Sequence, residues 1–96
     1  MIMERRLWMV AYDVSDNRRR LRLDRALQAL GQRIQYSVFE CHMTLVEARF
    51  HLGHLASDLD PQTDSLRAYP LCAWCEPAVK WVGEGRRTED RTLFIL

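Results

Sequence analysis

The stretch LWMVAYDVSDNRRRLRLDRALQALG, residues 7–31, contains the pattern that decides the fold. Residues 7–12 form a continuous apolar run containing Trp, Val and Tyr, which predicts a buried strand. Ser15 or Asp16 can cap a helix after this strand. The apolar residues of that helix recur at steps of three and four: Leu23, Ala26, Leu27 and Leu30. Gly31 then predicts a left-handed helix stop, so the stretch predicts a strand, a short loop and a helix.

The next stretch, GQRIQYSVFEC, alternates with the period of a strand. It predicts a second strand over residues 33–41, in which Ile34, Tyr36 and Val38 occupy the more buried face. Phe39 then falls on the other face, among polar neighbours. We expect a bend into a further strand before the next helix begins.

A second helix is predicted after residue 43. Thr44 and Glu47 have the spacing of a capping box. One apolar face is expected along this helix, made of Leu45, Ala48, Leu52, Leu55 and Leu59. SLRAYPLC, residues 65–72, predicts a strand in which Pro70 marks an edge or an end. AVKWVG, residues 78–83, and TLFIL, residues 92–96, are two further strand candidates.

This order of elements predicts an α+β fold, with helices on one face of a mostly antiparallel sheet. The arrangement is the ferredoxin-like βαββαβ sandwich with an extra C-terminal strand. We expect one domain over residues 1–83, a charged linker over 84–91, and a terminal strand over 92–96 that pairs in its own sheet or in a partner's. A chain of 96 residues builds only a modest core, so dimerisation is plausible from size but open.

Composition limits the class of protein. With 48% hydrophobic and 28% charged residues the chain is globular in character, and an odd number of cysteines, three, argues against a secreted disulfide framework. No apolar run approaches the roughly 20 residues that span a bilayer, and no signal peptide is evident. We therefore expect a cytoplasmic protein without a membrane partner.

Asp13 is the sharpest candidate for chemistry. A carboxylate at the end of a buried strand is held by rigid backbone and can ligate a hard cation. The alternative is structural: Asp13 opens a turn and Asp16 caps the helix. One carboxylate makes a poor magnesium site, whereas a symmetric pair of Asp13 residues in a dimer would make a sensible one.

Thirteen of the fourteen basic residues are arginine, and five of them lie at 18, 19, 20, 22 and 25. The first turns of a helix disfavour cations, so another demand favours them there. Arg18, Arg22 and Arg25 share one helical face and suit a stripe that follows phosphates. The alternatives are a solvated helix face and an Arg-rich composition throughout.

Cysteine and histidine offer weaker signals. Cys72 and Cys75 form a single CAWC, and neither Cys41 nor the histidines complete a zinc-site spacing, so we interpret the pair as buried or turn cysteines. His51 and His54 are expected on the surface of a helix, and His42 precedes it. Phe39 could stack on a base, contact a second subunit, or pack in the core.

Three segments in order, YDVSDNRRRLRL, GQRIQYSVFEC and DSLRAYPLCAWC, closely resemble the small nucleases of CRISPR adaptation, the Cas2 family. The resemblance covers about residues 8–83. It implies a ferredoxin-like homodimer in which Asp13 faces its symmetry mate and binds Mg²⁺ or Mn²⁺. In such a family this pair supports endonucleolytic hydrolysis of RNA or DNA during the acquisition of new spacers. Supporting roles for substrate or fold then extend to Tyr12, Asp16, Arg18, Arg20, Arg22, Arg33 and Phe39.

The same resemblance implies a second, non-catalytic role. The dimer would bridge two dimers of the CRISPR integrase, Cas1, and hold the double-stranded DNA that becomes a spacer. The arginines would then contact duplex phosphates, which carry little sequence information. The sequence leaves the choice between nuclease and adaptor open.

Overall fold

The computed structural model describes residues 4–80 and 82 of the chain. Its elements are β1 (Arg6–Asp13), α1 (Asn17–Leu30), β2 (Gly31–Gln35), β3 (Val38–Met43), α2 (Leu45–Ala56), β4 (Ser65–Pro70) and the 3-10 helix η1 (Glu76–Ala78). The predicted βαββαβ order is confirmed. The linker and terminal strand expected over 84–91 and 92–96 lie outside the described residues.

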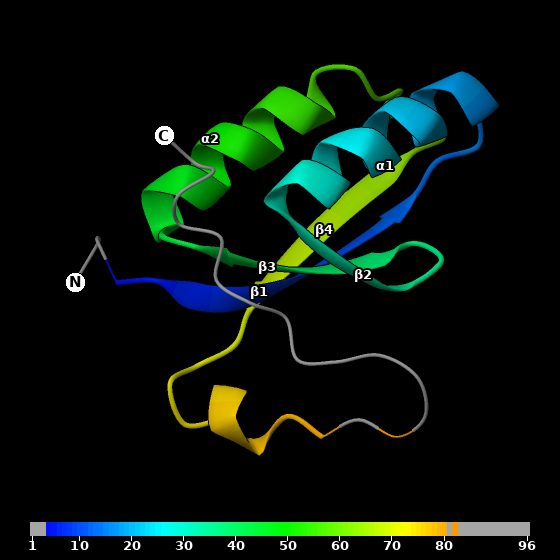
Figure 1. The fold of residues 1–96 in the computed structure, drawn as a ribbon. Helices are drawn as coiled ribbons and strands as arrows, with labels where there is room; N and C mark the ends of the chain where they lie inside the picture. Colours follow the sequence, from blue (N-terminus) through cyan, green and yellow to red (C-terminus); the bar gives the residue numbers. More distant parts are fainter. Residues whose placement is uncertain (1–3, 81, 83–96) are drawn as a thin grey trace.

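One antiparallel sheet carries both helices on the same face (Figure 1). The strand order is β2-β3-β1-β4, so β1 is a central strand between β3 and β4, and β4 is outermost among the described strands. This is the ferredoxin-like arrangement that the sequence predicted. The chain after β4 turns to the side of the sheet opposite the helices (Figure 1).

The core lies between the sheet and the helices. Alternate residues of β1 face it, because successive side chains of a strand point to opposite faces. The buried residues of the core are Trp8, Val10, Tyr12, Val14, Leu23, Leu27, Phe39, Cys41, Met43 and Ala48. Because Tyr12 points into the core, Asp13, the next residue, lies on the face of the sheet that α1 and α2 do not cover.

The single strand predicted over residues 33–41 is wrong. A turn at Tyr36 and Ser37 divides it into β2 and β3, with an irregular register between Arg33 and Gln35. The predicted faces are also reversed: the Tyr36 residue is 91% exposed, whereas Phe39 is 0% exposed. Alternation shows that two faces differ but does not show which one the helices cover, and the turn breaks the alternation in the middle.

Gly31 does not form the predicted left-handed stop. Its φ of −163° and ψ of −145° are extended, and it is the first residue of β2. Glycine is required there by close approach, because a Cβ at this position would lie 2.0 Å from the Glu40 carbonyl oxygen and 2.7 Å from the Cys41 Sγ. The helix therefore ends because the chain enters the sheet at once.

Both predicted helix starts are confirmed. The Asp16 carboxylate accepts a hydrogen bond from the backbone N–H of Arg19 at 2.9 Å, and Thr44 and Glu47 form the complete capping box. The apolar face of α2 is partly confirmed: Ala48 is buried, and Leu52 and Leu55 pack against the core. Leu59 also packs against the core, but it lies beyond the end of α2 at Ala56, so its prediction as a helix residue is wrong. Leu45 is exposed at the first helical position.

The end of the described chain departs from one strand prediction. Pro70 is the last residue of β4, so its prediction as an edge or end residue is confirmed. Ala78, in contrast, ends η1, and Val79, Lys80 and Val82 have no regular structure, so the strand predicted over 78–83 is wrong for these residues. Within the described ranges, none of the helices has the length and apolar character that crossing a membrane requires.

Candidate functional site

Asp13 ends β1 and pairs with Ser65 at the start of β4. Its residue is exposed, on the face of the sheet opposite the core. Among residues 4–80 and 82, no side chain or backbone group forms a hydrogen bond or ion pair with its carboxylate. The strand therefore holds a carboxylate whose oxygens are available to a ligand.

The loop after Asp13 is held by two of the five clustered arginines. The Arg20 guanidinium donates a hydrogen bond to the Val14 carbonyl oxygen at 3.0 Å. The Arg19 guanidinium donates from Nε to Asp64 Oδ2 at 2.9 Å and from Nη2 to Oδ1 at 3.4 Å. These two arginines turn back onto the chain beside Asp13, which fixes the position of the strand end.

Asp64 is the centre of this arrangement. Its side chain is 0% exposed, and besides Arg19 it accepts hydrogen bonds from the backbone N–H groups of Asp60 at 3.0 Å and Ser15 at 3.3 Å. The Arg19 guanidinium, followed by the Asp60 N–H, holds the pKa of this carboxyl well below its usual range. Asp64 therefore stays ionised and joins the β1–α1 loop to the loop before β4.

Asp16 serves the helix. Its carboxylate caps α1, and the hydrogen bond from the Arg19 N–H lowers its pKa. The structural alternative raised for Asp16 in the sequence therefore holds, whereas Asp13 makes no corresponding contact in the described part of the chain. Asp16 is therefore engaged in capping the helix, whereas the Asp13 carboxylate has no partner among the described residues.

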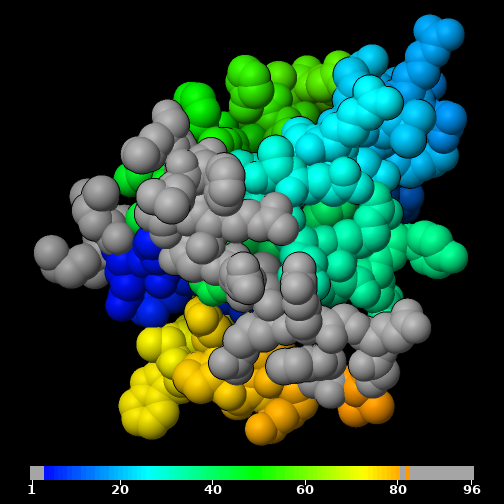
Figure 2. All heavy atoms as spheres, in the orientation of Figure 1, coloured from blue at the N-terminus to red at the C-terminus, as the bar shows by residue number. Residues whose placement is uncertain are grey.

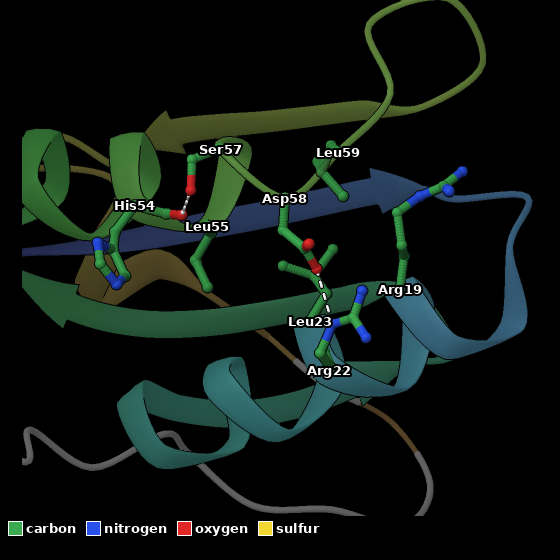
Figure 3. Close-up of a pocket in the computed structure, with 8 residues that line it drawn as sticks. All are labelled: Arg19, Arg22, Leu23, His54, Leu55, Ser57, Asp58 and Leu59. Atoms are coloured by element: carbon green, nitrogen blue, oxygen red, sulfur yellow. Dashed lines mark hydrogen bonds and ion pairs between the residues drawn. The ribbon is translucent and has the colours of Figure 1, made fainter.

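The predicted arginine stripe is exposed along α1 but unequal in its contacts. Arg22 donates from Nε to Asp58 Oδ2 at 2.8 Å, while the side chains of Arg18 and Arg25 make no hydrogen bond or ion pair with the described residues. Figure 3 shows Arg22 and Asp58 pointing toward each other across the groove between α1 and the end of α2. Arg18 and Arg25 are therefore the two stripe residues available to an anion.

Tyr12, Arg33 and Phe39 form an internal cluster. The Tyr12 and Phe39 rings are stacked with centroids 6.4 Å apart, and the Arg33 guanidinium lies 5.2 Å from the Phe39 centroid. The Tyr12 hydroxyl and the Arg33 Nη1 both donate to the Tyr36 carbonyl oxygen, at 3.3 and 2.8 Å. Arg33 also pairs with Asp24 at 3.0 Å. The cluster holds the β2–β3 turn, and of the three roles considered for Phe39 the structure shows core packing.

Two residues of this region were missed in the sequence. Asp64 lies in a turn-rich loop, and nothing local indicates that Arg19, 45 residues earlier, will pair with it. The alternation of the sequence predicts Tyr36 on a buried face, yet it is exposed in the turn between β2 and β3. The next residue, Ser37, accepts a hydrogen bond at its carbonyl oxygen from the backbone N–H of Tyr12, at 3.0 Å. The exposed tyrosine therefore lies at the same end of β1 as Asp13.

The donor set limits what one chain can bind. Within the described residues, no three His, Cys, Asp or Glu side chains come together as a metal site. Mg²⁺ accepts one or two carboxylates and completes its octahedron with water and phosphate oxygens. The Asp13 carboxylate, which has no partner among residues 4–80 and 82, fits one of these positions, and the remaining ligands must come from outside these residues.

Comparison with known proteins agrees with this fold and sequence. The family model described as CRISPR associated protein Cas2 matches residues 6–79. A protein of Thermus thermophilus named CRISPR-associated endonuclease Cas2 2 is 40% identical over 98% of this chain and 100% of its own length. One of Chloroflexus aurantiacus, named CRISPR-associated endoribonuclease Cas2 1, is 37% identical over 93% of this chain and 98% of its own.

Solved structures give the same result. The crystal structure of Streptococcus pyogenes Cas2 matches with a TM-score of 0.69 and 32% identity, over 80% of this chain and 99% of that one. A hypothetical protein from Thermus thermophilus matches with a TM-score of 0.75 and 34% identity, over 90% and 100% of the two chains. A small α+β protein with an exposed aspartate at the end of its central strand, this chain belongs to the CRISPR-associated Cas2 family.

Proposed function

We propose that the protein is a metal-dependent endonuclease that cleaves RNA or DNA during the acquisition of CRISPR spacers. One observation carries the proposal: the Asp13 carboxylate is exposed and without a partner among the described residues, at the end of a core strand. Family membership supports it, since relatives are named as endoribonucleases and as endonucleases.

The active form we propose is a homodimer that brings two Asp13 residues together. The face of the sheet that continues from Asp13 carries Met9 on β1 and Tyr69 on β4, which pair in register and are 37% and 45% exposed. Neither α1 nor α2 covers this part of the sheet, because both lie on its other face (Figure 1). Pairing two copies through this face would bury apolar surface and supply the second carboxylate that the described residues do not place beside Asp13.

Each Asp13 would contribute one carboxylate to a shared Mg²⁺ or Mn²⁺. A divalent cation held by the two carboxylates would polarise the scissile phosphate and lower the pKa of the attacking water. The chain's own contribution is positional: Arg20 holds the loop through the Val14 carbonyl, and Arg19 and Asp64 hold the two strand ends. Exposed Arg18 and Arg25 would contact substrate phosphates.

The test is cleavage of labelled single-stranded RNA and double-stranded DNA by wild type and by Asp13→Asn, with Mg²⁺, with Mn²⁺ or with chelator. Asn keeps the size of the side chain and removes the charge, so the fold should be unchanged. We expect metal-dependent cleavage by wild type and a loss of at least about 100-fold in the variant, as for removal of a group that acts in the transition state.

Asp16→Asn is the matched control. Its side chain can still cap α1, since Asn is as good an N-cap as Asp, and cleavage should stay near the wild-type rate. Equal cleavage by wild type and Asp13→Asn would contradict the catalytic assignment. Sedimentation of both proteins at the assay concentration checks that each is dimeric.

A second candidate function is the non-catalytic adaptor that bridges integrase dimers and holds duplex DNA. The observation that favours it is that the side chains of Arg18 and Arg25 are exposed on α1 and form no hydrogen bond or ion pair with the described residues. Phosphate contacts of this kind position a duplex without reading its sequence.

Spacer integration in a reconstituted mixture with the integrase distinguishes the two. The adaptor role predicts that Asp13→Asn supports integration as well as wild type, while the double substitution of Arg18 and Arg25 to Gln does not. The nuclease role in acquisition predicts loss with Asp13→Asn. If Asp13→Asn abolished cleavage but left integration unchanged, the nuclease activity would not be part of spacer integration.

A further inference from the structure

The turn that follows β4 brings two cysteines into contact. The Cys72 and Cys75 sulfur atoms lie 2.9 Å apart, both residues are exposed, and neither is oxidised. The backbone N–H groups of Cys75 and Glu76 both donate to the Cys72 carbonyl oxygen, at 3.0 and 3.1 Å. Backbone hydrogen bonds therefore preset the approach of the two side chains, which is the geometric condition for a disulfide.

The rest of the segment is fastened to the sheet. The Leu71 N–H donates to the Leu7 carbonyl oxygen at 2.8 Å, and the Leu7 N–H donates to Glu76 Oε1 at 3.1 Å. Glu76 Oε2 lies 3.4 Å from His42 Nε2 on β3. Figure 2 shows the segment, yellow to orange, at the surface of the molecule. The cysteine turn is thus exposed but anchored on both sides.

The two thiols are chemically unequal. The hydrogen bond between the two thiols lowers the pKa of Cys72, and the N–H groups of Cys75 and Trp74 lower it further. The same contact raises the pKa of Cys75. A thiolate is the attacking species in thiol–disulfide exchange, so Cys72 is suited to attack and Cys75 to follow.

We propose that Cys72 and Cys75 form a reversible dithiol–disulfide site. The Cys72 thiolate attacks one sulfur of a low-molecular-weight disulfide, forms a mixed disulfide and releases one thiolate, which takes up a proton. The Cys75 thiolate then attacks the Cys72 sulfur and releases the second small thiol. The protein loses two protons and two electrons, and the small disulfide takes them up and is reduced to two thiols.

This site is separate from the proposed nuclease site. The cysteine turn is fastened at Leu7, six residues from Asp13 along β1, and a strand of that length spans about 20 Å. Asp13→Asn should therefore react with oxidant as wild type does. Cys41 provides an internal contrast, because it is 0% exposed in the core and should stay reduced in the folded protein.

The experiment treats reduced full-length protein with oxidised glutathione, quenches with acid and measures the intact mass. Wild type should lose the mass of two hydrogens per chain, retain no glutathione, and regain the mass with excess reduced glutathione. Cys75→Ser should instead accumulate one glutathione adduct on Cys72, located by peptide mapping. Cys72→Ser should acquire its adduct several-fold more slowly.

Three results would overturn the proposal. A stable glutathione adduct on wild type would show that Cys75 does not resolve the mixed disulfide. Disulfide-linked chains on a non-reducing gel would show pairing between molecules. Unchanged mass after complete equilibration with oxidised glutathione, in protein that keeps its native circular dichroism, would show that the turn does not form the bond.

Discussion

The Arg19 guanidinium and the Asp64 carboxylate form a two-pronged pair that joins the first turn of α1 to the loop before β4, with Nε and Oδ2 2.9 Å apart. Asp64 precedes Ser65, the register partner of Asp13. The pair therefore lies beside the proposed site without using its carboxylate. Its role is to hold the end of β1, where Asp13 lies, against the start of β4.

Asp64→Asn should destabilise the protein at neutral pH more than in acid. The pKa of Asp64 is lowered in the folded protein, so its contribution to stability is fully present above the unfolded pKa of about 4 and is lost as pH falls below it. Urea unfolding of wild type and variant at pH 7 and at pH 3 measures this, and the gap between their midpoints should narrow in acid.

Asp58→Asn is the matched control, because Asp58 pairs with Arg22 at the surface, where both side chains are more than half exposed. Exposed pairs contribute about 0–1 kcal/mol, so this variant should unfold close to wild type at pH 7. Equal midpoints for Asp64→Asn and Asp58→Asn at pH 7 would contradict the role given to Asp64.

Gly31→Ala and Gly53→Ala should change stability in opposite directions. The Cβ at 31 would meet backbone at 2.0 Å and force β2 and β3 apart, at a cost of about 1–3 kcal/mol or more. The Cβ at 53 has nothing within 4 Å and would raise helix propensity in α2, a gain of about 0.5–1 kcal/mol. Chemical denaturation compares them, and a neutral Gly31→Ala would refute the close approach of the strands.

Phe39→Ala should lower the free energy of unfolding by about 3–5 kcal/mol, since it removes a fully buried ring that stacks on Tyr12 and lies under Arg33. Tyr36→Ala, at the exposed turn three residues earlier, should change it by about 0.5 kcal/mol or less. Thermal unfolding followed by circular dichroism tests both. If Phe39→Ala changed the free energy of unfolding only slightly but weakened nucleic-acid binding, the result would instead favour a role for Phe39 in stacking on a base.

Replacing Arg18 or Arg25 with Gln should weaken duplex binding equally for unrelated sequences and reduce the slope of log K against log salt by about 1 for each residue. Arg19→Gln is not a suitable phosphate control, because it breaks the Asp64 pair. Arg49, on the exposed surface of α2, is the better comparison and should leave the slope unchanged. An unchanged slope for Arg18→Gln and Arg25→Gln would contradict their assignment to phosphate.

The order of elements, the two helix caps and the place of Asp13 could all be predicted from local signals. Apolar runs, the capping box of Thr44 and Glu47 and the proline at 70 each act within a few residues of themselves. The β2–β3 hairpin could not, because period-two alternation continues across the turn at Tyr36 and is blind to which face the helices cover. Of the three roles that the sequence leaves open for Phe39, the structure shows core packing.

The sequence by itself determined the ferredoxin-like order of strands and helices and a carboxylate at the end of the central strand, since propensity, periodicity and capping are local properties of the chain. Only the tertiary structure decided which charged side chains form ion pairs with other described residues and which do not. Arg19 meets Asp64 and Arg22 meets Asp58 across separations of 45 and 36 residues, while Asp13, Arg18 and Arg25 meet no described partner. Such pairings depend on where the loops are brought together in space, which no local pattern records.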